Sequence, residues 1–199
     1  MAHVATMNEI ERYEAPLTPG WGKLMMWIFL CSDAMSFAGL LAAYAAVRMG
    51  NPEWPVPSSV LDVPLTALNT FILICSSVTM VKGLSAIRRG DRRGLVLWLL
   101  GTMAGGSIFL GIQAYEWTHL IVHEHLTIQS SLFGATFFIL TGFHGCHVFS
   151  GVVYLGCIAL KGARGGYTQE NNSSVEIAGL YWHFVDLIWI LVFTFVYLI

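Results

Sequence analysis

The chain has 199 residues, of which 56% are hydrophobic and only 11% are charged, and its formal net charge is −2. Because a soluble domain carries roughly 25% charged residues, this composition indicates a membrane protein. The small negative charge argues against nucleic acid as a partner, since nucleic-acid binding needs a basic surface.

Residues 1–20 form a polar tail, in which prolines and a glycine interrupt any helix before the first apolar segment. Five apolar segments follow and account for most of the chain, at residues 24–47, 64–81, 95–117, 131–160 and 177–199. At about 1.5 Å per residue, each approaches or exceeds the ~30 Å of a bilayer hydrocarbon core. The sequence therefore predicts an all-α, polytopic membrane protein with a single transmembrane domain of five helices over residues 21–199.

Basic residues predict how these helices are oriented. Nine of the ten lysines and arginines lie in or beside the N-terminal tail, the second-to-third connector or the fourth-to-fifth connector, and only Arg48 lies at the opposite end. Since basic residues concentrate on the cytoplasmic side, we expect the amino terminus and those two connectors in the cytoplasm and the carboxyl terminus outside. The first-to-second connector, 51–57, contains three prolines and is expected to be non-helical.

Ionisable residues recur near the middle of three spans. Counting about 1.5 Å per residue from the span centres places Asp33 about 4 Å and Asp186 about 3 Å to the cytoplasmic side of the midplane. His144 and His147 fall on either side of the midplane, and His183 lies about 7–8 Å toward the cytoplasm. An ionisable group at this depth is costly unless it is paired or functional, so the sequence predicts a polar layer shared by three helices.

The pairing within this layer leaves two interpretations open. His144 and His147 share a helix face, as do His183 and Asp186. A carboxylate near an imidazole can accept its N–H, and the two groups can share a proton. The layer either fastens helices together through hydrogen bonds or forms a site for protons or lipid headgroups.

Two further groups of polar residues lie near the expected outer surface. Glu116 ends the third span, where an interfacial carboxylate can be satisfied by Gln113 and His119 of its own helix face. The connector histidines His119, His123 and His125 have a spacing that resembles a divalent-metal chelate, although histidines in a short loop are more simply solvated. No metal site is therefore assigned there.

Two alternatives of a different functional class stay open. His144 and His147 lie on one helical turn and cannot bind opposite faces of one haem iron, so an intrinsic haem would need His183 or a partner chain. A small transporter could use the mid-depth carboxylates, although the absence of an internal sequence repeat argues weakly against it.

Four segments carry recognisable motifs, in the order MWIFLCSDAM at 26–35, QAYEW at 113–117, GFHGCHV at 142–148 and YWHFVDLIW at 181–189. The last two are similar to the G-x-H-G-x-H-V and Y-W-H-F-x-D-x-x-W signatures of subunit III of haem–copper terminal oxidases. QAYEW is similar to the Q-A-x-E-[YF] element of that family, with an aromatic change at its last position. The resemblance extends from about residue 21 to residue 199.

The resemblance implies a subunit of a respiratory oxidase that reduces oxygen to water in a bacterial plasma membrane. Such a subunit has no haem, copper or catalytic centre of its own, because these belong to partner subunits. It packs against the catalytic subunit I, beside subunits II and IV, binds phospholipid in a cleft and supports proton uptake. On this basis the candidate residues for proton handling are Asp33, Glu116, His144, His147, His183 and Asp186, with no metal ligands.

Two departures bear on the kind of oxidase. Mitochondrial-type members have seven helices, whereas this chain is similar to the shorter bacterial form. Many members have Glu at the position of Asp33, while bacterial quinol oxidase members are similar to this chain in having Asp. The electron donor, cytochrome c or quinol, stays open because this subunit does not carry the donor site. Related subunits associated with nitric oxide reductases share much of the pattern and remain the alternative.

Overall fold

A computed structural model describes residues 19–199, and every regular element in that range is a helix. The long helices are α2 (Pro19–Met49), α4 (Val63–Arg88), α5 (Arg92–Val122), α6 (Leu132–Ala163) and α7 (Ser173–Phe193). A short helix, α3 (Pro57–Val60), precedes α4, and a π-helical turn, η1 (Thr194–Leu198), extends α7. Nearly all of the polar tail predicted over 1–20 lies outside the described residues.

Side-chain caps explain where three of the helices begin. Asp62, Asp91 and Ser131 each accept a hydrogen bond from the backbone N–H three residues later, in the first turns of α4, α5 and α6. Such caps satisfy N–H groups that have no partner inside the helix. The proline-rich connector is non-helical from residue 51 to residue 56, and α3 begins at its last proline.

Among residues 19–199, five helices are long and apolar enough to cross a membrane, which confirms the predicted number. The helices continue beyond the predicted spans, most of all α4, which ends at Arg88 rather than near residue 81. Lys82 lies in this last part of α4, with its Nζ 4.7 Å from the centroid of the Trp98 ring on α5. The apolar segments of the sequence therefore correspond to the parts of the helices within the hydrocarbon core. Beyond them, α4 continues through residues such as Lys82, whose polar ends can reach the membrane interface.

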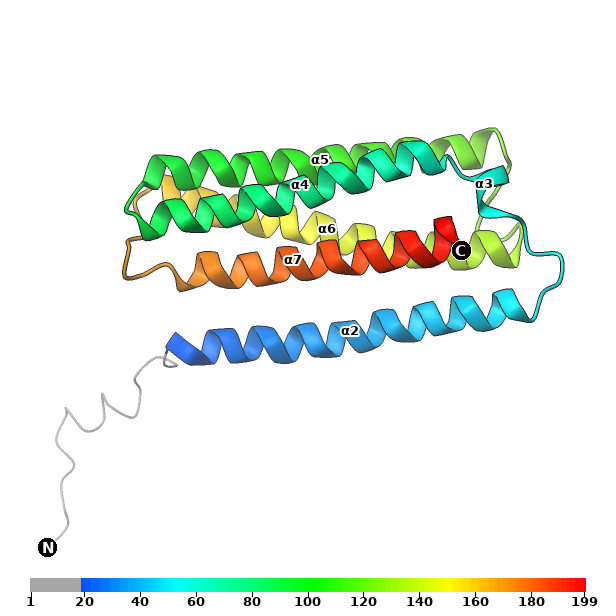
Figure 1. Ribbon diagram of the computed structural model, residues 1–199, viewed down its shortest axis with the longest axis horizontal. Coiled ribbons are helices and arrows are strands. Elements are labelled where there is room, and N and C mark those ends of the chain that lie inside the picture. The colour runs from blue at the N-terminus through cyan, green and yellow to red at the C-terminus, as the bar shows by residue number, and fades with distance from the viewer. Residues whose placement is uncertain (1–18) are drawn as a thin grey trace, which may run out of the picture.

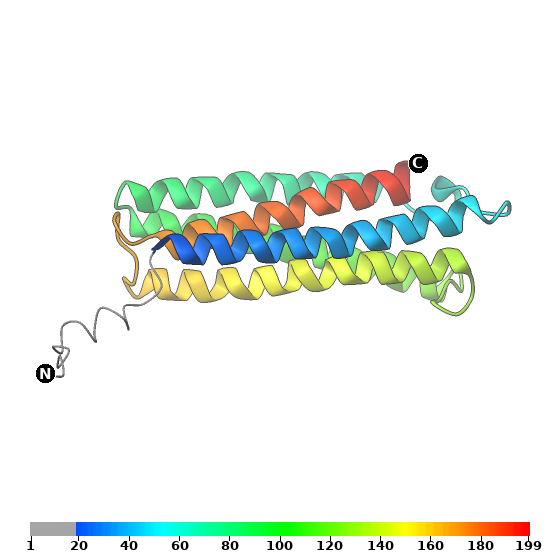
Figure 2. The ribbon, with the colours of Figure 1, turned by 90° about the horizontal axis from the view of Figure 1, so that it is seen from below.

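Helices α4 to α7 form an elongated bundle, and α2 packs along it against α6 and α7 (Figures 1 and 2). The α4–α5 and α6–α7 connectors lie at the end of the bundle where α2 begins (Figure 1). There, Glu176 Oε2 on α7 lies 2.8 Å from Lys23 Nζ and 3.5 Å from Arg88 Nη2, so one carboxylate links α2, α4 and α7. At the other end, the Arg48 guanidinium donates to the backbone carbonyl of Ile199.

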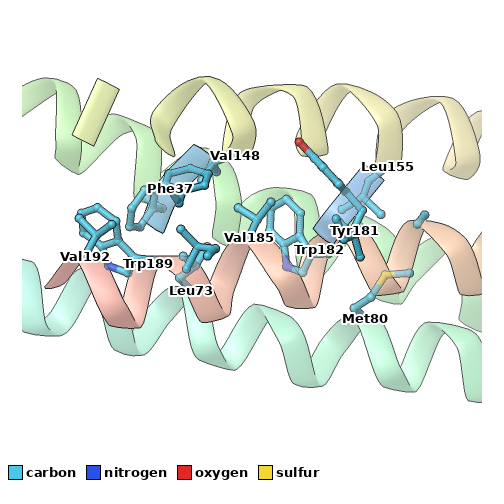
Figure 3. Close-up of a cluster of buried hydrophobic side chains, with 14 of the residues drawn as sticks. Phe37, Leu73, Met80, Val148, Leu155, Tyr181, Trp182, Val185, Trp189 and Val192 are labelled. Atoms are coloured by element: carbon cyan, nitrogen blue, oxygen red, sulfur yellow. The ribbon is translucent and has the colours of Figure 1, made fainter. Parts of the chain in front are cut away.

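Two tryptophans of α7 lie at the centre of the bundle (Figure 3). Trp182 and Trp189 are each 1% exposed, and their indole N–H groups donate to Ser76 Oγ at 3.0 Å and to Thr70 Oγ1 at 2.9 Å. The Trp182 ring lies so close to Gly106 on α5 that a Cβ at this glycine would be 2.5 Å from it. Close packing of α4, α5 and α7 thus depends on the large side chain of Trp182 and on the absence of a side chain at Gly106.

Candidate functional site

Asp33 of α2 and His147 of α6 meet across the interface between these helices. His147 Nε2 lies 3.1 Å from Asp33 Oδ1, and His147 Nδ1 lies 2.7 Å from the backbone carbonyl of Phe143. Because a carbonyl oxygen only accepts hydrogen bonds, Nδ1 must carry a hydrogen. A hydrogen bond across the 3.1 Å contact then requires one more proton, on Nε2 or on the carboxyl group.

This proton can reside on either member of the Asp33–His147 pair. The two forms are an imidazolium beside a carboxylate and a neutral imidazole beside a carboxylic acid, and neither has a net charge. The pair is shielded, since Asp33 is 8% exposed and the rings of Phe37 and Phe143 lie 5.2 Å and 4.7 Å from the imidazole centroid. The arrangement can hold a proton at mid-depth without placing a net charge in hydrocarbon.

A second polar cluster joins α4 to α7. Ser77 Oγ donates to Asp186 Oδ2 at 2.9 Å, and His183 Nδ1 lies 3.2 Å from the same hydroxyl oxygen. The predicted neighbours His183 and Asp186 are thus linked through Ser77. The helical segment that holds them runs from 173 to 198, and both residues lie within about 4 Å of its centre along the helix axis.

His144 belongs to neither cluster. It is 0% exposed, and neither ring nitrogen has a hydrogen-bond partner among the described residues. Its ring lies among those of Phe37, Phe109 and Trp189, at centroid distances of 6.3, 5.7 and 4.8 Å. Of the residues predicted to share one polar layer, His147 pairs with Asp33, His183 and Asp186 are linked through Ser77, and His144 lies apart from both clusters. Residues three apart differ by about 60° around a helix, which is enough for His147 to face α2 while His144 faces the aromatic core.

Glu116 lies near the outer end of α5 and is buried inside the bundle, at 7% exposure. Thr66 Oγ1 on α4 donates to its Oε1 at 3.1 Å, and the Tyr197 hydroxyl on η1 donates to its Oε2 at 2.9 Å. The expected bond from Gln113 is absent, because Gln113 Nε2 donates to the backbone carbonyl of Thr141 at 2.8 Å. The partners come from neighbouring helices because Glu116 faces the bundle.

The other expected partner of Glu116, His119, forms no hydrogen bond with it. The ring of His119 instead lies 4.7 Å from that of His123, and both are exposed. Within residues 19–199, no three or more His, Cys, Asp or Glu side chains are grouped so as to hold a metal ion. His119, on the last turn of α5, and His123 thus form an exposed pair.

Three hydroxyl residues, Thr66, Ser77 and Tyr197, complete these clusters and are not identified by the sequence argument. A hydroxyl in an apolar helix commonly bonds to its own backbone, as Thr70 Oγ1 does to the carbonyl of Thr66 at 2.8 Å, so its presence alone indicates little. The position along the helix could have identified one of them, Ser77, as a partner of Asp186. Ser77 lies near the centre of α4, as Asp186 does in the helical segment 173–198.

Comparison with known proteins identifies the family. The model of the family described as cytochrome c oxidase subunit III matches residues 13–199. The chain belongs to the cytochrome c oxidase subunit III family. It is 41% identical to cytochrome c oxidase subunit 3 of Corynebacterium diphtheriae over 86% of this chain and 85% of that protein. It is 37% identical to the same subunit of Thermostichus vulcanus, over 91% and 89% of the two chains.

The family also includes subunits of quinol oxidases. This chain is 35% identical to quinol oxidase subunit 3 of Bacillus subtilis over 88% of its own length and 85% of that protein. The resemblance to subunit III of haem–copper oxidases is thereby confirmed over most of the chain. In this family the redox centres of the oxidase are not carried by subunit III.

Proposed function

We propose that the chain is the non-redox accessory subunit III of a bacterial respiratory haem–copper oxidase that reduces oxygen to water and translocates protons. The match to the subunit III family over residues 13–199 carries this proposal. Haem and copper belong to partner subunits, and cytochrome c or quinol is the electron donor. The chain stabilises the catalytic subunit I, alongside subunits II and IV, and binds membrane phospholipid.

The support for proton uptake comes from the Asp33–His147 pair. The two side chains meet at 3.1 Å where α2 meets α6, a distance at which a carboxyl group and an imidazole can share a proton. Most of the basic residues lie in the α4–α5 and α6–α7 connectors or on the helix ends beside them, at the end of the bundle where α2 begins (Figure 1). Under the positive-inside rule this end faces the cytoplasm of a bacterial plasma membrane, from which an oxidase takes up protons.

The proposal is tested by purifying the affinity-tagged chain from its native membranes in a mild detergent. We expect the catalytic subunit to co-purify, and we expect haem absorbance to stay with that subunit when the chain is separated from it. An oxidase prepared without the chain should begin turnover normally and then lose activity during turnover. An isolated chain with a haem Soret band and stoichiometric iron would contradict the non-redox role.

A further inference from the structure

The exposed pair formed by His119 and His123 has no role in the function proposed above. It lies at the end of the bundle opposite the α4–α5 and α6–α7 connectors, where α5 ends at Val122 (Figure 1). Histidines in a short loop are most simply solvated, and the sequence alone assigns no metal to them. The structure instead places His119 on the last helical turn, and His123 keeps helical dihedral angles, φ −97° and ψ −42°.

The helical backbone brings the two imidazoles onto one face of α5. The backbone N–H of His123 donates to the carbonyl of His119 at 2.9 Å, which closes the last turn of the helix. Residues four apart on a helix are neighbours on its surface. The ring centroids are 4.7 Å apart, and both side chains are exposed. The two rings are therefore free to turn toward one shared ligand.

The separation of the rings suits two imidazoles bound to one metal ion. A metal–nitrogen bond of about 2.0–2.1 Å puts each ring centroid about 3.2 Å from the ion. Two such centroids are about 4.5 Å apart in a square-planar site and about 5.2 Å apart in a tetrahedral one. The observed 4.7 Å lies between these values. Two histidines four residues apart on one helix face are a known arrangement for binding zinc.

The surroundings of the pair favour a cation. Asp62 and Glu116 line a pocket of about 270 Å³ together with His119, between α3, the start of α4 and the end of α5. Within residues 19–199, Arg48 is the only lysine or arginine at this end of the bundle, and its guanidinium donates to the carbonyl of Ile199. The carboxyl end of α5 adds the negative end of the helix dipole.

We propose that His119 and His123 bind one divalent transition-metal ion, Zn²⁺ or Cu²⁺, at the end of α5. Imidazole nitrogen suits both ions, whereas Mg²⁺ and Ca²⁺ prefer oxygen ligands. No group of three or more His, Cys, Asp or Glu side chains is found within residues 19–199, so water completes the coordination. The site is separate from the redox metals of the oxidase and does not rest on the proposed function.

Calorimetric titration of the purified full-length chain with zinc chloride in detergent tests the site. Every preparation carries His3→Asn and alanine at the four cysteine positions, so that these side chains do not compete, and its affinity tag contains no histidine. We expect one Zn²⁺ per chain. His119→Asn and His123→Asn should each weaken binding about tenfold or more, because one arm of the chelate is lost. His125→Asn is the matched control from the same connector and should not change the affinity.

The electron paramagnetic resonance spectrum of bound Cu²⁺ provides a second measurement, because it reports the nitrogen ligands directly. We expect the hyperfine pattern of two imidazole nitrogens, and of one in His119→Asn or His123→Asn. Thermal unfolding without metal, followed by tryptophan fluorescence, should give the same Tm for both variants as for the parent chain, since both positions are exposed.

Other outcomes would overturn the inference. Equal Zn²⁺ affinity of the parent chain and the folded His119→Asn or His123→Asn variant would show that the pair does not hold the ion. Displacement of Zn²⁺ by an equal concentration of Ca²⁺ or Mg²⁺ would assign the ion to carboxylates such as Asp62 instead. A Cu²⁺ spectrum unchanged by both substitutions would also contradict the assignment.

Discussion

His144 and His147 illustrate at the residue scale how one motif places two identical side chains in opposite chemical situations. His147 has a hydrogen-bond or ionic partner for each ring nitrogen, at 2.7 Å and 3.1 Å, whereas His144 has none among the described residues and is surrounded by aromatic rings. The segment GFHGCHV therefore combines one residue of the Asp33–His147 pair with one residue of the aromatic core.

Leucine substitutions should separate these two roles. For His147→Leu we expect a loss of about 1–3 kcal/mol in the free energy of unfolding, because Asp33 is then buried without its partner. For His144→Leu we expect a change within about 1 kcal/mol, or a gain, because an unpaired polar group is replaced by an apolar one. Detergent-based unfolding of the purified chain measures both. A larger loss for His144→Leu would indicate a hydrogen bond to that ring.

Asp33→Asn tests whether the pair handles protons. An asparagine can donate to His147 Nε2 and so preserve the contact, but it cannot take up the shared proton. We expect the variant oxidase to assemble and to start turnover close to the wild-type rate, then to lose activity faster or pump fewer protons per oxygen. Oxygen consumption and pH changes in proteoliposomes measure this.

Glu53→Gln is the control for Asp33→Asn, because Glu53 is exposed in the connector before α3 and belongs to neither polar cluster. It should leave both the duration of turnover and the proton yield close to wild type. If Asp33→Asn were indistinguishable from wild type in both assays, Asp33 would be a packing residue.

At the scale of elements, the helices approach one another where small residues oppose Trp182. A Cβ at Gly106 would lie 2.5 Å from the Trp182 ring and 2.8 Å from Val152 Cγ2, whereas a Cβ at Gly111, on the same helix, would meet nothing within 4 Å. Gly106 and Gly111 therefore serve different purposes. The first permits close packing, and the second has no contact that requires it.

Alanine substitutions should reveal this difference. We expect Gly106→Ala to destabilise the chain by about 1–3 kcal/mol, because α5 and α7 must move apart or Trp182 must leave its position. Gly111→Ala should be neutral or stabilising by up to about 1 kcal/mol, since alanine is the better helix former. Thermal unfolding in detergent with Trp fluorescence compares them. Equal stability of the two variants would contradict the packing role of Gly106.

The number and order of the helices could be predicted from the sequence because apolar length reports directly on membrane crossing. The position of each ionisable residue along its helix could also be predicted, since a helix has a constant rise per residue. The partners could not. Whether Asp33 meets His147, or Glu116 meets Thr66 and Tyr197, depends on how each helix is rotated about its axis and on which helix packs against it. The sequence of a single helix contains no information about either.

At the scale of the whole molecule, the α4–α5 connector, the α6–α7 connector and the start of α2 lie at one end of the bundle (Figure 1). Their basic residues predict that this end is cytoplasmic. In a chain whose four native cysteines are replaced by alanine, we expect Asn51→Cys to react with a membrane-impermeant maleimide added outside intact spheroplasts. Gln169→Cys should react only after permeabilisation. The reverse pattern would place the amino terminus outside.

The position of Asp33 on α2 also has a consequence for biosynthesis. His147 is made 114 residues after Asp33, and at about 5–20 residues per second this interval lasts roughly 6–23 s. α2 can therefore enter the bilayer before the imidazole that pairs with its acid exists. Hydrocarbon excludes a lone carboxylate, so we expect Asp33 to enter the membrane already protonated. The proton of the pair would thus be acquired during translation, before the first turnover of the enzyme.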